Sequence, residues 1–318
     1  MRNFTSVHDV KDPISLIKEG SSLKKSPWEN VHLGKNKTLG LIFLNPSLRT
    51  RLSSQKAGQL LGMNVIVMNM DKEGWALEWS DGAVMNANKT EHIKDAAMVL
   101  SSYCDIIGMR CFPTLTDREA DYTEHVMKQL IKYSTVPVVS LESATLHPLQ
   151  SLADCISIYE KWNLPEKPKV VLTWAPHVKA LPQAVANSFS EWMQAINVEF
   201  VITHPKGYEL APAFTKDVHI EHDQEKALKG ANFVYVKNWS TYEPYGQMLP
   251  VEKDWLLSEQ KMKATNNGYI MHCLPVRRNV ELPDELLDGH RSLIPLQAEN
   301  RLYAATAVFK RILENNKS

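Results

Sequence analysis

Short apolar runs alternate with longer amphipathic segments along most of the chain. The apolar runs are typical of buried strands, and the segments between them are typical of helices. We expect strands over residues 38–44, 64–69, 104–108, 136–140, 169–174, 199–203, 232–236 and 268–273. We expect helices over residues 13–19, 47–61, 91–102, 119–133, 147–162, 181–196, 224–229, 258–264 and 300–314. Such an alternation predicts an α/β fold whose parallel sheets are covered on both faces.

The chain is long enough for two domains. Its 318 residues would fill two units of about 150 residues each. The sequence Pro-Glu-Lys-Pro at 165–168 is typical of a boundary. We predict two doubly wound parallel-sheet domains, over residues 1–150 and 151–299, with the last helix packing back on the first. Because ligands bind at the carboxyl ends of parallel strands, we expect the active site in the cleft between the two domains.

Composition excludes several classes of partner. Lys+Arg and Asp+Glu both number 36, and a formal charge of zero gives no indication of a nucleic-acid partner. The N-terminus has no apolar signal core, and no apolar run has the length of a membrane span. The four cysteines, which are Cys104, Cys111, Cys155 and Cys273, have no CxxC spacing. We therefore expect a cytoplasmic protein with reduced thiols.

A charged helix start follows the first predicted strand. Ser47 is a suitable N-cap, and the expected buried side of the helix is Leu48, Leu52, Ala57, Leu60 and Leu61. A helix start has unpaired backbone N–H groups and the positive end of the helix dipole. Arg49, Thr50 and Arg51 add two guanidinium groups and a hydroxyl, which predicts a phosphate site. The alternative is a capped surface helix with two solvated arginines.

Other polar side chains follow predicted strands or begin helices. Arg110 and Glu142 follow strands, and His147 and Gln150 begin a helix. Lys237 follows another strand, as does the segment His272-Cys-Leu-Pro275 with two arginines beyond it. Each has an ordinary structural explanation when taken alone: a solvated charge, a capping histidine or a buried cysteine.

Taken together, these motifs resemble a known family. Ser47-Leu-Arg-Thr-Arg51, Arg110, His147-Pro-Leu-Gln150 and His272-Cys-Leu-Pro275 match the aspartate and ornithine carbamoyltransferases in order and approximate spacing, across residues 38–301. The resemblance implies transfer of the carbamoyl group of carbamoyl phosphate to an amine, with no cofactor and no metal. His219 and His222 are close in the sequence, but no further metal ligands are visible beside them.

One departure from the ornithine pattern indicates a particular branch. Residues 237–246 read Lys-Asn-Trp-Ser-Thr-Tyr-Glu-Pro-Tyr-Gly, without the Ser-Met-Gly loop that holds free ornithine. This region resembles the branch that uses N-acylated ornithine, whose acylated nitrogen carries no charge to pair with an Asp. Thr306 stands where the acetyl-using members have a Lys, which favours N-succinylornithine over N-acetylornithine. Thr90 matches neither the Pro of the succinyl type nor the Glu of the acetyl type.

The resemblance also implies roles for individual residues. Carbamoyl phosphate would be bound by Ser47, Leu48, Arg49, Thr50, Trp75, Arg110, His147, Gln150 and Arg301. The residues implied in catalysis are Arg110, His147, Gln150 and Cys273. The acylornithine would be bound by Glu142, Trp174, Lys237, Cys273, Leu274, Arg277 and Arg278. The family forms trimers in which the loop over residues 71–90, with Trp75, reaches a neighbouring active site.

Two other classes fit less well. A non-catalytic anion-binding paralogue could share this fold, since fold does not fix function, but all the expected donors are present. A nucleotide-dependent oxidoreductase would need a Gly-x-Gly-x-x-Gly turn after a strand, and the sequence has none.

Overall fold

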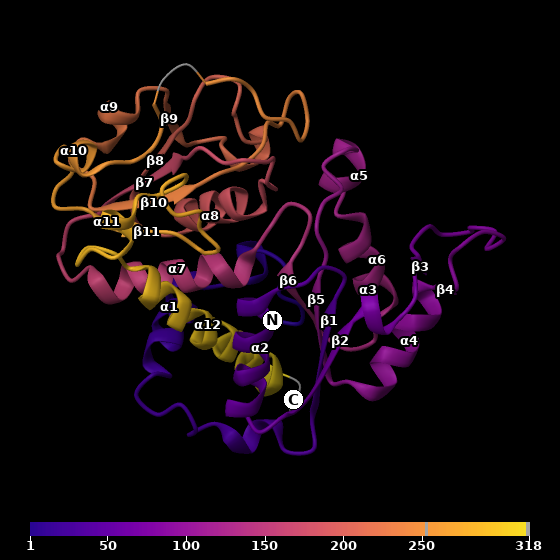
Figure 1. Ribbon diagram of the computed structural model, residues 1–318. Helices are drawn as coiled ribbons and strands as arrows, with labels where there is room; N and C mark the ends of the chain where they lie inside the picture. The colour runs from indigo at the N-terminus through magenta and orange to yellow at the C-terminus, as the bar shows by residue number, and fades with distance from the viewer. Residues whose placement is uncertain (252–253, 316–318) are drawn as a thin grey trace. The chain divides into compact units, whose positions relative to one another are not determined.

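The computed structural model describes residues 1–251 and 254–315, which form two compact units (Figure 1). The first unit contains Met1–Thr114, Glu119–Leu149 and the chain from Arg301 onward. The second contains Leu115–Arg118 and Gln150–Asn300. In both units every strand of the main sheet is parallel to its neighbours. The predicted α/β fold with two parallel-sheet units is confirmed, and the cleft expected between them stays a prediction.

The sheet of the first unit has the order β2-β1-β5-β6. Its strands are β1 (Thr38–Phe43), β2 (Asn64–Asn69), β5 (Ile106–Arg110) and β6 (Val138–Glu142). Its longer helices are α1 (Pro13–Ser22), α2 (Leu48–Leu60), α4 (Ile93–Tyr103) and α6 (His125–Tyr133). The strand order changes direction between β1 and β5. The carboxyl ends of these two strands are therefore the expected place for a ligand in this unit.

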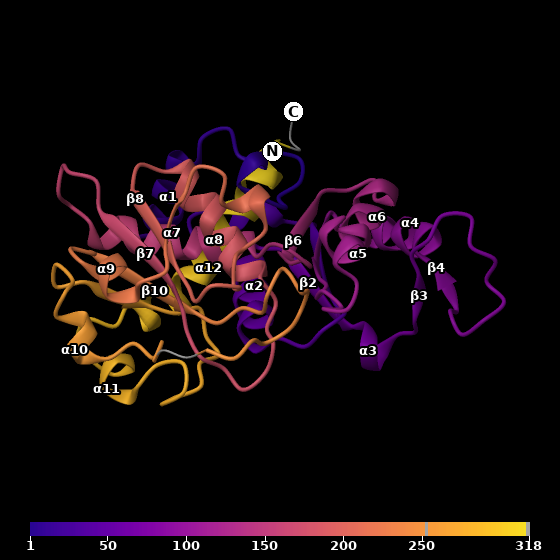
Figure 2. The ribbon, with the colours of Figure 1, turned by 90° about the horizontal axis from the view of Figure 1, so that it is seen from above.

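The segment after β2 is irregular, as expected for residues 71–90. It contains the short helix α3 (Met70–Glu73) and the two-residue strands β3 (Leu77–Glu78) and β4 (Glu91–His92), which pair with each other. Figure 2 shows the loop between β3 and β4 at one end of the first unit.

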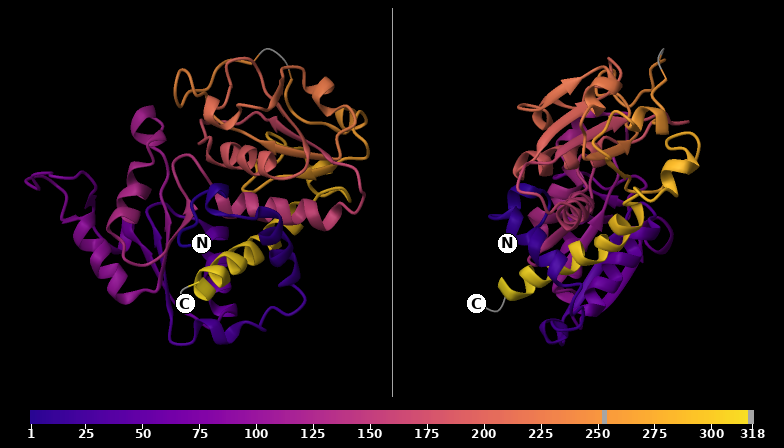
Figure 3. Two further views of the ribbon diagram at one scale, coloured as in Figure 1. Left: turned by 180° about the vertical axis from the view of Figure 1, so that it is seen from behind. Right: turned by 90° about the vertical axis from the view of Figure 1, so that its left-hand side faces the viewer.

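The long C-terminal helix α12 (Ile294–Asn315) runs beside α1 in the first unit (Figure 3). Glu19 of α1 pairs with Lys310 at 2.8 Å and with Arg311 at 2.6 Å. Buried Phe309 and Ile312 lie on the same helix. The helix begins at Ile294 rather than at residue 300, so the predicted helix was too short.

The sheet of the second unit has the order β11-β10-β7-β8-β9. Its strands are β7 (Lys169–Trp174), β8 (Glu199–Thr203), β9 (His219–Glu221), β10 (Phe233–Lys237) and β11 (Tyr269–Met271). Its helices are α7 (Pro148–Lys161), α8 (Ala184–Ala195), α9 (Gln224–Leu228), α10 (Glu259–Met262) and α11 (Asp284–Leu287). Here the order changes direction between β7 and β10. Strand β9 and helix α11 were not predicted, because each is too short to show a period in the sequence.

Two local predictions were wrong. The single helix expected over residues 119–133 is divided into α5 (Arg118–Tyr122) and α6, because Glu124 has a left-handed backbone with φ 54°. Leu48 and Leu52 of α2 are 69% and 59% exposed instead of buried. The helix lies close to the sheet through small residues instead, since a Cβ on Gly58 would come within 2.9 Å of Leu39.

No described helix combines the length and apolar character that crossing a bilayer requires.

Candidate active site

The predicted phosphate-binding helix start lies at the carboxyl end of β1. The hydroxyl of Ser47 accepts a hydrogen bond from the N–H of Thr50 at 3.3 Å, so Ser47 is the N-cap of α2. Thr50 is 2% exposed and Arg49 is half-buried. The side chain of Leu48 faces solvent, which leaves only its backbone N–H for the predicted role. The helix start thus has the donors and the dipole that favour an anion.

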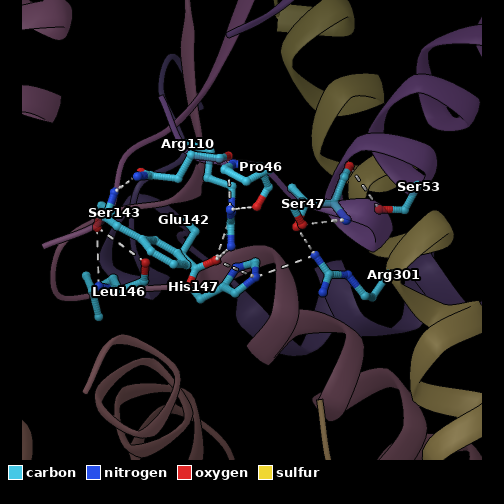
Figure 4. Close-up of polar contacts among 12 residues, drawn as sticks. Pro46, Ser47, Ser53, Arg110, Glu142, Ser143, Leu146, His147 and Arg301 are labelled. Carbon is cyan, nitrogen blue, oxygen red and sulfur yellow. Dashed lines mark hydrogen bonds and ion pairs between the residues drawn. The ribbon is translucent and has the colours of Figure 1, made fainter. Parts of the chain in front are cut away.

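Arg110 is held beside that helix start by a carboxylate, two carbonyl groups and an aromatic ring (Figure 4). Its Nε and Nη2 donate to Oε2 of Glu142, at 3.1 Å and 2.9 Å. Its Nη1 donates to the carbonyl oxygens of Asn45, at 3.0 Å, and Pro46. The ring of Phe112 stacks on the guanidinium group, with 4.1 Å from the ring centroid to Cζ. The side chain is 7% exposed, so its orientation is fixed in advance.

His147 completes the group from the start of α7. Its Nε2 lies 3.6 Å from Oε2 of Glu142 and 3.5 Å from Nη2 of Arg301. Burial lowers the pKa of His147 well below 6.5, and the positive charges of Arg301, Arg110 and Arg49 lower it further. The imidazole is therefore neutral at pH 7. A neutral ring can donate one hydrogen bond to an oxygen without carrying charge into the site.

Arg301 of α12 contacts the same group of residues. Its Nη2 donates to Oγ1 of Thr50 at 2.5 Å. The predicted residues Ser47, Thr50, Arg110, His147 and Arg301 are thus brought together within the first unit (Figure 4). Glu142 was assigned to the acylornithine, but in this group its carboxylate contacts Arg110 and His147.

Glu124 is a supporting residue that the sequence did not indicate. Its Oε1 accepts hydrogen bonds from the hydroxyl of Ser143, at 2.6 Å, and from the N–H of Thr145, at 2.8 Å. The hydroxyl of Thr145 also donates to it. The turn formed by Ser143 and Leu146, with 2.8 Å from the Ser143 N–H to the Leu146 carbonyl, leads directly into His147. A carboxylate on another element therefore fixes the chain before the histidine. The left-handed backbone of Glu124 was the feature that no local pattern revealed.

In the second unit two predicted residues stand side by side. Trp174 ends β7 and Lys237 ends β10, and the two are paired in register at the point where the strand order changes direction. The indole N–H of Trp174 donates to the carbonyl of Trp239 at 3.0 Å, and its ring packs tilted against the Tyr208 ring at 4.6 Å between centroids. Both predicted residues are buried, with Lys237 7% exposed.

The segment after β11 carries the other predicted residues of this unit. Cys273 is 8% exposed, and Leu274 has a left-handed backbone with φ 55°. The N–H of Leu274 donates to Nδ1 of His272 at 2.9 Å, so the backbone turns sharply here. Such a turn displays carbonyl groups in a fixed direction.

Glu281 is a buried anion near this segment that the sequence analysis missed. It is 1% exposed, and one of its oxygens accepts from the N–H of Arg277 at 2.9 Å. Burial alone would raise its pKa, but His272, whose Nε2 lies 3.7 Å from Oε1 of Glu281, and the charge of Lys237 lower the pKa of Glu281 to about 2. Lys237, a positively charged residue predicted to bind the acylornithine, therefore has the buried carboxylate of Glu281 near it.

Arg277 and Arg278 differ in their partners. Arg278 donates to Asp284 at 2.6 Å and to both oxygens of Asp288 at 2.8 Å. The Nε of Arg277 instead donates to Nε2 of His177 at 3.2 Å. Arg278 thus already pairs with two carboxylates, whereas the partner of the Arg277 side chain is an imidazole.

Gln150 and Trp75 have partners of their own. The amide of Gln150 donates to Asp154 at 2.8 Å within α7 and is fully buried. Trp75, in the irregular segment after β2, is 53% exposed and donates to Glu91 at 2.8 Å.

One side-chain cluster contradicts the sequence analysis. His222 was thought to lack further metal ligands, but His204 and Glu209 lie beside it, with the potential ligand atoms within 4.8 Å of one another. The interpretation missed this cluster because strand β9, which ends just before His222, was not recognised.

The fold and this arrangement of donors are typical of a class: α/β proteins with a helix start suited to an anion. Known proteins identify the class further. Residues 2–160 match the carbamoyl-phosphate-binding domain model of aspartate/ornithine carbamoyltransferases, and residues 182–312 match the Asp/Orn-binding domain model. The chain belongs to the aspartate/ornithine carbamoyltransferase family and is a transferase.

The more similar relatives lie in one branch of that family. The chain is 50% identical to N-succinylornithine carbamoyltransferase of Bacteroides fragilis (strain 638R), over 99% of both chains. It is 34% identical to N-acetylornithine carbamoyltransferase of Xanthomonas campestris pv. campestris, over 89% of each. A crystal structure of acetylornithine transcarbamylase complexed with acetylcitrulline is 31% identical, with a TM-score of 0.93 over 98% of this chain and 99% of that one. The predicted family and its N-acylornithine branch are therefore confirmed.

Proposed function

We propose that the protein transfers the carbamoyl group of carbamoyl phosphate to the δ-amine of N-succinylornithine, giving N-succinylcitrulline and phosphate. The observation that carries the proposal is the 50% identity with a named N-succinylornithine carbamoyltransferase over 99% of both chains. N-acetylornithine is the second candidate substrate, since named acetylornithine enzymes are 34% identical.

The phosphate group would bind at the start of α2. Arg49, the hydroxyls of Ser47 and Thr50, and the N–H of Leu48 would donate to its oxygens, with Arg301 beside Thr50. Trp75 would reach this site from a neighbouring subunit. Guanidinium groups bind phosphate with two parallel hydrogen bonds, and the helix dipole adds to their effect. The same donors stabilise phosphate as the leaving group.

The carbonyl oxygen would lie against Arg110 and His147. When the δ-amine attacks the carbonyl carbon, a C–N bond forms and negative charge develops on this oxygen. The C–O bond to phosphate then breaks, phosphate leaves with the bonding electrons, and the amine nitrogen loses a proton. Donors that are already oriented lower the barrier because they do not reorganise during the step. Arg110 meets this requirement, since Glu142 and two carbonyl groups hold it. Gln150 would position the carbamoyl nitrogen.

The acylornithine would use the ends of β7, β10 and β11. The backbone carbonyls of Cys273 and Leu274 would orient the δ-amine, and Trp174 and Glu142 would contact the rest of the substrate. Lys237 and Arg277 would pair with carboxylate groups, with Arg278 further along the same segment.

The choice of succinyl over acetyl rests on two observations in addition to identity. Thr306 is 1% exposed, and its hydroxyl donates to the carbonyl of Leu302 within α12, so this position has a short side chain with its own partner. Arg277 has an imidazole rather than a carboxylate as the partner of its side chain. A succinyl carboxylate offers that guanidinium group a charged partner that an acetyl methyl does not.

Assembly, pathway and location follow as further parts of the proposal. Exposed Trp75 and the exposed pair Leu48 and Leu52 support association with other copies of the chain, which we propose to be a homotrimer. The proposed product belongs to arginine biosynthesis. None of the four cysteines, all of which lie in the described residues, forms a disulfide, and all four are buried, which supports a reducing compartment, the cytoplasm.

A product assay tests the proposal. Purified protein is incubated with carbamoyl phosphate and, in separate reactions, with ornithine, N-acetylornithine or N-succinylornithine, and the ureido product is measured. We expect the highest kcat/KM with N-succinylornithine. A preference for N-acetylornithine would replace the substrate and keep the reaction. No product with any of the three, from protein that binds carbamoyl phosphate, would favour a non-catalytic anion-binding paralogue.

A further inference from the structure

Three side chains that commonly bind metals meet in the second unit, at the carboxyl ends of two neighbouring strands. His204 follows β8 directly and His222 follows β9 directly, and the two strands are parallel and paired. Glu209 lies in the segment between them. Their potential ligand atoms are all within 4.8 Å of one another. These strands are not the pair at which the sheet changes direction, and none of the three residues has a role in the proposed transfer.

The histidines are held with the same ring nitrogen toward the backbone. Nδ1 of His204 lies 2.8 Å from the carbonyl oxygen of Pro205, and Nδ1 of His222 lies 3.0 Å from the carbonyl oxygen of His204. A carbonyl oxygen only accepts, so each Nδ1 carries the proton and each Nε2 presents a lone pair. A second hydrogen bond of this kind is what orients most histidines that bind metals in proteins.

Charge and burial also suit a cation. His204 is 1% exposed, so its ring is held in place by its surroundings. Glu209 supplies a negative charge, and its Oε1 accepts from the N–H of Gly207 at 3.2 Å. A divalent cation would thus meet two neutral nitrogens and one carboxylate, a combination found in zinc enzymes with an open fourth position.

We propose that His204, Glu209 and His222 bind a divalent transition-metal ion of the zinc class. Ligand atoms at about 2.0–2.1 Å from a tetrahedral zinc ion lie about 3.4 Å from one another. To bring the ligand atoms from 4.8 Å to that separation, side chains must move by roughly an ångström. A change of side-chain rotamer at Glu209 or His222 can provide this movement. Glu209 is exposed and His222 is half-buried, whereas His204 is fixed.

Such an ion would fix the segment between β8 and β9. That segment carries Tyr208, whose ring packs tilted against Trp174 and whose carbonyl accepts from the indole of Trp239 at 2.8 Å. The ion would therefore stabilise the packing behind Trp174. The transfer reaction would not pass through it.

Zinc binding to the full-length protein tests the site. Chelator-treated protein is titrated with Zn²⁺ in competition with a chromophoric chelator, and the visible absorption of bound Co²⁺ reports the coordination. We expect one ion per chain, a Co²⁺ spectrum typical of four or five ligands, and a higher melting temperature with Zn²⁺. We expect His222→Ala and Glu209→Gln to weaken Zn²⁺ binding about 100-fold or more, since even the loss of an outer partner costs 10- to 100-fold.

His219→Ala is the matched control. His219 lies on β9, three positions before His222, and is exposed outside the cluster. We expect this variant to bind Zn²⁺ as the wild type does. Folding of all variants is checked by circular dichroism without metal. The proposal is wrong if the folded wild type binds no Zn²⁺, if His222→Ala binds it unchanged, or if His219→Ala loses it equally.

Discussion

Arg301 donates to the hydroxyl of Thr50 at 2.5 Å, although the two residues are 251 positions apart in the chain. The contact joins α12 to the start of α2. The chain that passes through the second unit thus returns to complete the proposed phosphate-binding group of the first unit. Arg301 also lies 3.5 Å from Nε2 of His147, so the same guanidinium group influences two of the proposed donors. A truncation before α12 would remove part of the site as well as part of the core.

We expect Arg49→Ala to abolish most carbamoyl transfer while the protein stays folded. Arg49 stands in the first turn of α2, where a phosphate would meet both its charge and the free N–H groups. Losing a desolvated, charge-assisted contact costs about 2–5 kcal/mol, or roughly 30- to 5,000-fold in kcat/KM. Steady-state kinetics with carbamoyl phosphate measures the loss.

Lys56→Ala is the control for Arg49→Ala. Lys56 lies on the same helix, with its amine 4.7 Å from the centroid of the Trp28 ring. We expect this variant to keep its activity. Near-normal activity of a folded Arg49→Ala protein would argue against the phosphate site at α2.

The depressed pKa of His147 predicts how stability depends on pH. Its ordinary pKa is 6.5, and burial with Arg301 and Arg110 nearby lowers it well below that value. Between the two values the unfolded state binds a proton that the folded state does not. Folding stability therefore falls as the pH drops below about 6.5 towards the folded-state pKa.

His147→Gln tests this dependence, because glutamine does not titrate. The free energy of unfolding is measured in urea at about pH 8 and about pH 5.5. We expect the wild type to lose more stability than the variant between these conditions. An equal loss in both proteins would mean that His147 is protonated in the folded state. The wild-type kcat/KM should also show no titration of His147 near pH 6.5.

Glu124→Gln should weaken the turn that precedes His147. The carboxylate accepts hydrogen bonds from Ser143 and Thr145, and hydrogen bonds to a charged group contribute about 1.5–3 kcal/mol. We expect a loss of unfolding free energy of that order and a lower kcat. Glu119→Gln, at an exposed position of α5, is the control. A Glu124→Gln protein with unchanged stability and normal kcat would show that the turn before His147 does not depend on the Glu124 carboxylate.

Much of the fold could be predicted because strands and helices alternate in sequence. The end of β1 and the cap at Ser47 could be predicted for the same reason: apolar periodicity and capping are local properties. The interruption of the predicted helix 119–133, which was missed, depends on contacts with residues distant in the sequence. Glu124 interrupts a helix because Ser143 and Thr145 bind its carboxylate, and no local pattern contains that information.

The prediction of which side of α2 is buried was wrong for a related reason. Hydrophobicity alone placed Leu48 and Leu52 inside, yet Gly58, with Ala57, lets the helix approach the sheet. In the site, individual residues could be found from motifs, but their pairing could not. Glu142 was assigned to one substrate, and only the register of β5 against β6 places it beside Arg110.

Trp75 should act across a subunit interface. It is 53% exposed, in a segment with little regular structure, and its indole donates to Glu91. A large aromatic side chain that is exposed in the single chain often marks a surface that another chain covers. We expect Trp75→Ala and Arg49→Ala each to be inactive alone. Mixed trimers that have exchanged subunits should recover activity, because one site can take each residue from a different chain. Activity that stays absent after confirmed exchange would contradict a shared site.

Arg277 should set the preference for a succinyl over an acetyl group. Its Nε donates to His177 at 3.2 Å, whereas Arg278 pairs with Asp284 and Asp288. A carboxylate can therefore bind the Arg277 guanidinium group without displacing another carboxylate. A charged hydrogen bond of this kind contributes about 1.5–3 kcal/mol, or roughly 10- to 150-fold in selectivity.

The experiment compares Arg277→Met with the wild type on both substrates. We expect kcat/KM for N-succinylornithine to fall by that factor and kcat/KM for N-acetylornithine to change little, so that the acetyl substrate is an internal control. Arg278→Met is the matched comparison, one position along the chain. Because its loss leaves Asp284 and Asp288 without their shared cation, we expect it to affect local stability more than the ratio of the two substrates. A ratio that changes in Arg278→Met and not in Arg277→Met would assign the succinyl carboxylate to the other arginine.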